Sequence, residues 1–317
     1  MKEKILIFGN GQIGNFYNDY FKSKNITSKI SKADITNIEE VTKSIEEFDP
    51  TVVINTAAKT NLEWCDKNRL EAFNVNVLGA DNIAQVCDKK GIYFIHLSSG
   101  CIFESKDEND WKKEDSEPKP AAYYSLTKVW AEQLIQLKKS PNFKYLILRP
   151  RQPVSAQINY KNMLIKFLTF TKFVDTPNTG TVIEDLMDWT LQLIEKKPVG
   201  ILNIANEGYT TPYKIAKLLK KYVLPELPIE KISKEELDKI TPNRRVDTIL
   251  DVSKLKSLVK NVKTYDERIE EIIKKLAENF KNGDIEEIKK QLELTVMQSK
   301  QRTIVNEVWT NLIKRKK

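Results

Sequence analysis

The chain contains few of the residues that build disulfide-rich or metal-binding proteins. Its 317 residues include three cysteines and one histidine. Three irregularly spaced cysteines are too few for a disulfide framework or a zinc site, and such scarcity is typical of a reducing compartment. The single histidine, His96, lies inside an apolar run that predicts a strand. We therefore expect it to pack in the interior rather than to act in catalysis, and we predict no metal site.

Long apolar segments are also missing. No run approaches the ~18 apolar residues that a membrane-spanning helix needs. The polar start at residues 1–4 leads straight into a predicted strand, without the apolar region of a signal peptide. Internal repeats and low-complexity linkers are not evident either. We expect a soluble, cytoplasmic protein with no membrane partner.

The charge balance is basic but not concentrated. The net charge is +8, with 30% charged and 40% hydrophobic residues, which is ordinary for a folded globular chain. Lysines are scattered along predicted helix faces, and the densest basic cluster is residues 314–317. This distribution favours a solvated surface and an anionic small-molecule ligand, and we expect no nucleic-acid partner.

Apolar runs alternate with helical patterns through the first half of the chain. Continuous apolar strands that are joined by helices indicate a parallel sheet covered on both faces, because neither face then meets water. The fold class is therefore α/β, with a doubly wound parallel sheet of the Rossmann type. The predicted strands are residues 5–8, 51–55, 93–98 and 145–149, and a further strand ends near 27–31.

Beyond Pro150 the pattern loosens, and this change sets the expected domain boundaries. Residues 1–150 form a nucleotide-binding Rossmann domain, to which segments at about 181–204 return. A smaller substrate-binding lobe takes residues 151–180 and 205–280, beginning with a helix through residues 163–170. Residues 281–317 form a helical tail that packs on its own chain or on a partner subunit, with one apolar face made by Ile285, Ile288, Leu292 and Leu294.

A glycine-rich turn follows the first strand. Gly9, Gly11 and Gly14 have the spacing of a dinucleotide-binding turn: the first glycine allows a tight turn, the second lets backbone approach a pyrophosphate, and the third lets helix and strand pack closely. The helix that begins near Gln12 and Ile13 then offers free N–H groups to phosphates. The context of strand, turn and helix predicts a bound dinucleotide cofactor.

The cofactor's form is suggested by the end of the second strand. An acidic residue there would bind the ribose hydroxyls of NAD, but residues 27–32 contain none. Lys29, Ser31 and Lys32 would instead tolerate a 2′-phosphate. NADP, bound as NADPH, is favoured, and NAD remains possible.

A second constellation predicts hydride-transfer chemistry. Tyr124 and Lys128 are four residues apart and so share one helix face. An ammonium beside a tyrosine favours its phenolate, so we expect Lys128 to lower the pKa of Tyr124. Ser99 follows a buried strand at the carboxyl edge of the sheet, where ligands bind in such folds. It can hydrogen-bond a substrate carbonyl while Tyr124 donates the proton that accompanies hydride addition.

These residues carry a resemblance to the extended short-chain dehydrogenase/reductase family, in its nucleotide-sugar branch. Residues 55–59 resemble the loop that lies along the cofactor, residues 74–79 the asparagine segment, and residues 98–103 the catalytic strand end. One departure is the glycine turn, where many members have an extra residue between the first two glycines. The resemblance implies cofactor contacts by Asp34, Ala57, Ala58, Lys59, Asn76 and Ser98, besides Gly9, Gly11, Gln12, Ile13, Gly14, Tyr124 and Lys128.

Within this branch the chain is similar to the dTDP-4-dehydrorhamnose reductases. It resembles still more closely the bifunctional 3,5-epimerase/4-reductases that make UDP-L-rhamnose. The resemblance covers roughly residues 5–255 and does not extend to the tail. It implies a UDP- or dTDP-linked sugar substrate and a homodimer formed through the Tyr124 helix. The matching stretches are residues 63–66, 100–104, 148–153, 159–166 and 174–178.

Epimerisation needs two acid–base groups besides the hydride machinery, because protons leave one face and return on the other. The resemblance assigns these roles to Cys101 and Lys166, and it gives substrate contacts to Gly100, Cys101, Arg151 and Arg245. Cys101 can equally be a small apolar filler, and Lys166 a surface lysine; ordinary reductases have an aromatic residue at the Cys101 position. A monofunctional reductase and a non-catalytic NADP-binding regulatory subunit therefore remain as alternatives.

Overall fold

A six-stranded parallel sheet forms the centre of the molecule, which we describe from a computed structural model covering residues 3–138, 140–241 and 243–298. Its strand order is β2-β1-β3-β4-β6-β10, with every neighbouring pair parallel. The predicted doubly wound sheet is thus confirmed. Its strands are β1 (Lys4–Phe8), β2 (Thr27–Ser31), β3 (Val52–Asn55), β4 (Tyr93–Leu97), β6 (Tyr145–Arg149) and β10 (Gly200–Asn203).

The strand order creates a switch point beside β1. The chain leaves β1 towards β2 on one side and returns with β3 on the other. In open parallel sheets, ligands bind outside the carboxyl ends of the strands at such a point, because the two connecting segments diverge there and leave a crevice. The glycine turn follows β1 and the loop from Asn55 follows β3, so both lie at this edge.

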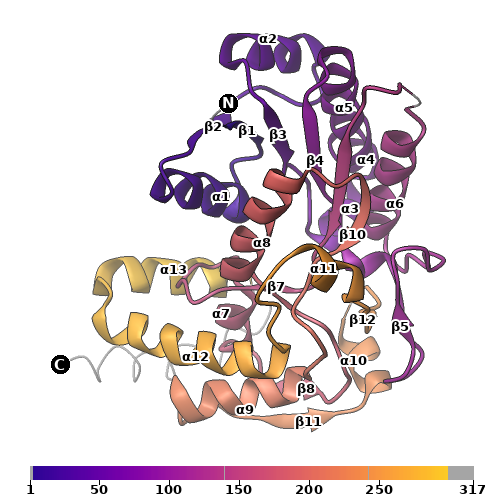
Figure 1. The fold of residues 1–317 in the computed structure, drawn as a ribbon. Helices are drawn as coiled ribbons and strands as arrows, with labels where there is room; N and C mark the ends of the chain where they lie inside the picture. The colour runs from indigo at the N-terminus through magenta and orange to yellow at the C-terminus, as the bar shows by residue number, and fades with distance from the viewer. Residues whose placement is uncertain (1–2, 139, 242, 299–317) are drawn as a thin grey trace.

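Helices cover both faces of the sheet (Figure 1). Ile5 and Ile7 of β1 pack towards one helical layer, whereas Leu6 and Phe8 pack towards the other, as alternate residues of a strand must. The first layer contains α1 (Gln12–Ser23), α8 (Ile183–Lys196) and α11 (Ser253–Leu258). The second contains α2 (Ile38–Phe48), α5 (Gly79–Lys90) and α6 (Tyr123–Gln136), and α3 (Leu62–Lys67) and α4 (Arg69–Phe73) precede α5.

A second lobe lies beyond the carboxyl ends of the strands and has an apolar core of its own (Figure 1). Three two-stranded pairs, β11–β8, β12–β5 and β7–β9, lie outside the main sheet. The pair β12–β5 joins the two halves of the chain, because β5 (Trp111–Lys112) precedes α6 and β12 follows α10. The remaining elements are the π-helical turn η1 (Asn74–Leu78), the 3₁₀ turn η2 (Gly100–Ile102), β7 (Pro153–Val154), α7 (Met163–Phe167), β8 (Lys172–Val174), β9 (Thr181–Val182), α9 (Pro212–Tyr222), β11 (Glu230–Ile232), α10 (Lys234–Ile240), β12 (Ile249–Leu250), α12 (Tyr265–Asn282) and α13 (Ile285–Gln298).

The helix ends in this lobe follow local capping chemistry. Thr264 caps α12 by accepting from the Glu267 N–H, and Ser233 and Glu236 form a capping box at α10. Helix α7 ends at Phe167, three residues before the predicted end. The following residues form turns whose hydrogen bonds join residues three apart, such as the Thr169 N–H to the Lys166 carbonyl.

The tail helix α13 packs against its own chain. Ile288 and Leu292 join the core of the second lobe, whereas Ile285 is 36% exposed, so the predicted apolar face is narrower than expected. The rest of the predicted tail, residues 299–317, lies outside the described residues. Among the residues that are described, no helix is both long and apolar enough to cross a membrane.

Candidate active site

The glycine turn after β1 is built by close backbone approach. Gly9 has a φ of +106°, a backbone angle that residues with a side chain rarely adopt. A Cβ on Gly14 would lie 2.0 Å from the Gly9 carbonyl oxygen. Helix α1 begins after Gly11, and no side chain among the described residues caps its first N–H groups. The Gln12 side-chain Nε2 beside this helix end is buried and has no partner in the described structure, while Ile13 packs on the sheet core. A donor-rich helix end of this kind suits a phosphate.

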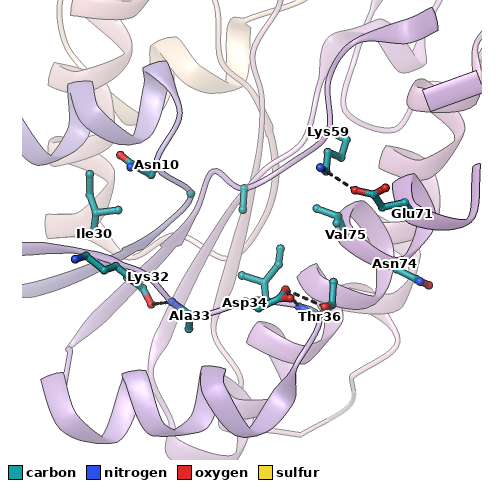
Figure 2. Close-up of a pocket in the computed structure, with 14 residues that line it drawn as sticks. Asn10, Ile30, Lys32, Ala33, Asp34, Thr36, Lys59, Glu71, Asn74 and Val75 are labelled. Carbon is teal, nitrogen blue, oxygen red and sulfur yellow. Dashed lines mark hydrogen bonds and ion pairs between the residues drawn. The ribbon is translucent and has the colours of Figure 1, made fainter. Parts of the chain in front are cut away.

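A cavity of about 900 Å³ opens at the switch point between these segments. In Figure 2, Asn10 of the glycine turn and Lys32 lie on one side of it, and Lys59 lies on the other, paired with Glu71. Four predicted cofactor residues therefore line one space: Gly9, Asp34, Ala57 and Lys59. Ala58 follows Ala57 in the same loop.

The two lysines near the second strand differ in their surroundings. Lys32 lines the cavity, whereas the Lys29 ammonium lies 6.0 Å from the centre of the Phe48 ring. The Ser31 hydroxyl is bonded to that of Ser44 at 2.7 Å. Asp34 accepts hydrogen bonds from the backbone N–H and hydroxyl of Thr36, at 2.9 and 2.8 Å, so its carboxylate is turned into a local loop at the cavity wall.

The side chain of Asn76 is bound within the protein itself. It is 1% exposed, and its amide holds the loop after β3: the Lys59 N–H donates to its Oδ1 at 2.7 Å, and its Nδ2 donates to the Lys59 carbonyl at 3.0 Å. The same Nδ2 donates to the Thr127 hydroxyl at 3.0 Å. Asn76 thus ties the cofactor-side loop to helix α6 instead of facing the cavity.

Ser99, Cys101 and Tyr124 meet at the carboxyl end of β4. The hydroxyl of Ser99 donates to the Cys101 sulfur at 3.0 Å, and that of Ser125 donates to the same sulfur at 3.2 Å. The Ser99 hydroxyl also lies near enough to the Tyr124 phenol to lower its pKa, against the larger effect of burial. The structure therefore brings the predicted serine, tyrosine and cysteine to one point. Ser125 was not predicted as a site residue, although its position directly after Tyr124 could have indicated it.

The electrostatics of the Tyr124–Lys128 pair differ from the expectation. Desolvation, with smaller effects from Cys101 and Cys65, raises the pKa of Tyr124 above its ordinary value, and Lys128 is not among the causes. The Lys128 ammonium, which is 2% exposed, donates instead to the Leu97 carbonyl at 2.8 Å. Burial lowers the pKa of Lys128 to about 8. In this structure Tyr124 is therefore a phenol that keeps its proton.

Ser98 and Gly100, on either side of Ser99, are turned into the protein. The Ser98 hydroxyl donates to the buried carboxylate of Glu132, and its N–H donates to the Leu148 carbonyl. Gly100 is buried, and a Cβ there would meet Leu250 at 2.9 Å. Any contact that these two residues make with cofactor or substrate therefore stays a prediction. His96 is 1% exposed, and burial holds the pKa of its imidazole well below the usual range, which confirms it as a packed strand residue.

The predicted substrate arginines are engaged by the protein itself. The Nη2 of Arg151 donates to Asn178 Oδ1 at 2.7 Å and to the Val246 carbonyl at 2.5 Å, although its buried Nε has no partner in the described structure. Arg245 pairs with Glu63 at 2.7 Å.

Lys166 is partly buried at the last turn of α7. Burial lowers its pKa, and the nearby charges of Lys161 and Arg245 act in the same direction. This direction favours a neutral amine that can accept a proton.

With this geometry in place, the chain can be compared with known proteins. Residues 3–278 match the RmlD substrate binding domain family. The chain belongs to that family. Its sheet and its Tyr124–Lys128 helix are those of an extended short-chain dehydrogenase/reductase fold, as the resemblance implied.

Individual relatives have related names. The chain is 28% identical over 265 residues to a bifunctional dTDP-4-dehydrorhamnose 3,5-epimerase/dTDP-4-dehydrorhamnose reductase of Arabidopsis thaliana, with 80% of this chain and 86% of that protein covered. A trifunctional UDP-glucose 4,6-dehydratase/3,5-epimerase/reductase of the same plant is 30% identical over 264 residues. The aligned residues cover 80% of this chain but only 39% of that longer protein.

Solved structures show the same fold. The UDP-rhamnose synthase of Acanthamoeba polyphaga mimivirus superposes with a TM-score of 0.80 at 24% identity, covering 87% of this chain and 100% of that one. A dTDP-4-dehydrorhamnose reductase of Bacillus anthracis, solved in complex with NADP, gives a TM-score of 0.75 at 22% identity, covering 86% of this chain and 99% of that one.

Proposed function

We propose that this protein reduces a nucleotide-linked 4-keto-6-deoxyhexose with NADPH and also epimerises carbons 3 and 5, giving an L-rhamnose-type nucleotide sugar. The observation that carries the reductase activity is the meeting of Ser99 and Tyr124 beside a buried Lys128, at the strand edge where the cavity opens. The names of the relatives point to the same chemistry.

The cavity and the glycine turn fit a dinucleotide. A Cβ at Gly14 would fill the space that the turn needs, and the unpartnered Nε2 of Gln12 lies at the end of α1, where a pyrophosphate can accept from it. Asp34 and Ala57 line the remaining wall. Lys32 would face the 2′-phosphate that distinguishes NADPH from NADH, and the NADP complex of a family structure supports this preference.

When bound, NADPH supplies the hydride for the keto carbon. Ser99 would donate a hydrogen bond to the keto oxygen and so orient it. Tyr124 would give its proton to that oxygen; because burial raises the pKa of Tyr124, the phenol retains this proton until negative charge develops on the oxygen. Lys128 would bind the cofactor ribose through its buried ammonium. The same ammonium would keep a positive charge near Tyr124.

The epimerase step is assigned to Cys101 and Lys166. Each carbon beside a ketone is acidic, so a base on one face and an acid on the other invert it. The Cys101 sulfur accepts hydrogen bonds from the hydroxyls of Ser99 and Ser125, so it lies beside the serine that would bind the keto oxygen. Burial lowers the pKa of Lys166, which favours the neutral amine that accepts a proton. The two groups come from different parts of the fold, Cys101 from the turn after β4 and Lys166 from α7 of the second lobe.

The second lobe would bind the nucleotide part of the substrate, with Arg245 and the neighbouring Arg244 released from their carboxylate partners to meet the diphosphate. We further propose a homodimer through helix α6. Light scattering of the purified protein at micromolar concentration tests this: twice the chain mass is expected, and a single-chain mass would refute it.

One assay tests the reductase. Purified protein is mixed with NADPH or NADH and with the UDP- or dTDP-linked 4-keto-6-deoxyglucose, and cofactor oxidation and product are followed. We expect NADPH to be consumed and a 6-deoxyhexose to form. Binding of NADPH without its oxidation by either sugar, even after a separate 3,5-epimerase is added, would favour the non-catalytic regulatory subunit and reject the proposal.

Deuterium oxide separates the two enzyme alternatives. If the enzyme is bifunctional, we expect deuterium at carbons 3 and 5 of the product. The variant Cys101→Ser should abolish this exchange while the protein still binds NADPH. If the wild-type protein reduces only a sugar that a separate epimerase has already converted, and introduces no deuterium, the monofunctional reductase is the correct reading.

A further inference from the structure

A buried ion pair lies directly beneath the proposed catalytic residues. The Arg149 guanidinium binds the Glu132 carboxylate with two contacts, Nη2 to Oε2 at 2.6 Å and Nε to Oε1 at 3.0 Å. Each side chain is 3% exposed. Arg149 also donates to the Glu114 carbonyl at 2.8 Å, and its guanidinium lies 5.0 Å from the centre of the Phe103 ring. Every strong donor and acceptor of the pair is therefore used inside the protein.

The pair touches both elements that carry the hydride-transfer residues. Glu132 lies four residues after Lys128 on helix α6, hence on the same helix face as Tyr124 and Lys128. Its Oε1 also accepts the hydroxyl of Ser98, the residue immediately before Ser99. One carboxylate thus links the catalytic helix to the end of β4, while Arg149 anchors it to β6.

Stability alone gives no reason for this arrangement. Two charges removed from water incur a large desolvation cost, and replacing such a pair by well-packed apolar residues often leaves stability unchanged or raises it. By contrast, a bidentate contact fixes both partners in distance and in plane, which a methionine or leucine would not do.

We propose that the Glu132–Arg149 pair is a positioning element of the hydride-transfer site, setting the place of Lys128 relative to Ser99. Neither residue touches a reacting atom; both act through Ser98 and Lys128. This inference rests on the proposed function, because it presumes that Lys128 and Ser99 act on cofactor and substrate.

The electrostatics supply an independent readout. Burial lowers the pKa of Lys128, and the negative charge of Glu132 opposes that effect. Replacing the carboxylate by an amide removes one opposing contribution, so the lysine would lose its proton at a lower pH. Other ionisable groups that act on Lys128 or face it come from several elements: Cys101 after β4, Cys65 on α3, His96 on β4 and Tyr124 on α6.

The test compares Glu132→Gln and Glu132→Asp with the wild type in NADPH-dependent turnover from pH 6 to 10. For Glu132→Gln we expect kcat to fall at least about tenfold at pH 7 and the alkaline fall in kcat/KM to move down by about one pH unit, the usual spread of pKa values in proteins. Glu132→Asp, which keeps the charge, should return the alkaline limb towards its wild-type position.

The matched control is Asp185→Asn. It breaks another bidentate Arg–carboxylate contact, in which Arg268 donates to both oxygens of Asp185 at 2.8 Å. Both residues lie outside α6 and β4, the elements that carry the proposed catalytic residues. This control variant should lower Tm without moving the pH profile. The proposal is overturned if Glu132→Gln has the wild-type pH profile, or if its loss of activity merely follows its loss of Tm as in the control.

Glu132→Gln leaves Arg149 as an unpaired buried charge, and such variants can fail to fold. The double variant Glu132→Leu with Arg149→Met removes both charges and avoids that cost. We expect it to fold, with a Tm near the wild type, and to show the same loss of kcat and the same shift of the alkaline limb. A double variant with wild-type kcat and profile would overturn the proposal.

NADPH binding keeps this test separate from the proposed function. Quenching of protein fluorescence measures NADPH binding without any sugar. The affinity of the protein for NADPH should fall above the pH at which Lys128 loses its proton. A wild-type protein that turns over neither keto sugar would reject the proposed reductase. A shift of the binding limb in Glu132→Gln would still support the positioning role, and an unshifted limb would overturn it.

Discussion

The two sides of the site are built in different ways. On one side, Ser99, Cys101, Tyr124 and Lys128 are buried or half-buried and contact one another or the backbone. On the other, three consecutive residues of the second lobe reach across to carboxylates of the first: Asn243 to Asp66 at 2.6 Å, Arg244 to Glu104, and Arg245 to Glu63 at 2.7 Å. We call residues 243–245 the strap.

The difference in exposure has an energetic consequence. Lys128 is 2% exposed, whereas the side chains of Arg244 and Arg245 are 56% and 38% exposed. Exposed ion pairs contribute only about 0–1 kcal/mol to stability, so a substrate diphosphate can displace the carboxylates at little cost. We infer that the hydride side is assembled before substrate arrives, whereas the strap exchanges partners when it binds.

The largest effect that this comparison expects is on Tyr124. Tyr124→Phe removes the proton donor while the aromatic ring still fills its place, so kcat should fall about 10²–10⁴-fold. NADPH affinity should stay near the wild-type value, because the preassembled residues around the ring remain. Stopped-flow turnover and fluorescence titration measure the two quantities. A kcat within threefold of the wild type would show that another group supplies the proton.

The pH dependence sharpens the account of the hydride side. Because the pKa of Lys128 is lowered to about 8, its ammonium is present below that pH and is lost above it. We therefore expect kcat/KM to fall above about pH 8 in the free enzyme. In Lys128→Met the residual activity should lack this alkaline limb. An unchanged limb in that variant would assign it to a different group.

The strap should control substrate binding rather than chemistry. Arg245→Gln removes a charge-assisted contact, and we expect KM for the nucleotide sugar to rise about tenfold with kcat largely retained. The matched control is Glu63→Gln, which frees the arginine and should leave KM unchanged or lower it. If both variants raise KM equally, the ion pair itself, rather than the free arginine, holds the active conformation.

The smallest effect is expected at Lys32, which lines the cavity, and Lys29, which does not line it, offers a matched comparison. Lys32→Ala should weaken NADPH binding several-fold and leave NADH binding unchanged, because a single exposed contact to the 2′-phosphate is lost. Lys29→Ala, at a lysine that lies over Phe48, serves as the control and should change neither affinity. Equal effects of the two variants would show that the 2′-phosphate is not read at Lys32.

Much of the fold could be predicted because its signals are local. Strands β1, β3, β4 and β6 are short apolar runs between helical patterns, and the glycine turn is a fixed spacing. The strand order was not predicted, because nothing in a run of apolar residues says which strand it pairs with. The 3.6-residue period also overestimated the tail's apolar face, since packing against α7 decides which residues are covered.

The site likewise has residues that local spacing predicts and residues that it does not. Spacing of four located Tyr124 and Lys128, and the next step of four would have located Glu132, had a buried carboxylate been sought there. The strap pairs Arg245 with a glutamate 182 residues away, and Asn76 holds a loop that is 17 residues away. Contacts at such separations leave no pattern in a single sequence, so the sequence could not show that side-chain atoms of Asn76, Ser98 and Arg151 bind partners within the protein itself.

The measurement that tests the central claim most directly follows the hydride. Wild-type protein is given NADPH that carries deuterium at carbon 4 of the nicotinamide, together with the nucleotide-linked 4-keto-6-deoxy sugar in ordinary water. If the Ser99–Tyr124–Lys128 corner is a reductase site, deuterium from one face of the cofactor appears at carbon 4 of the sugar, and Tyr124→Phe suppresses the transfer. If the sugar is recovered without deuterium while NADPH stays bound and intact, the account is contradicted.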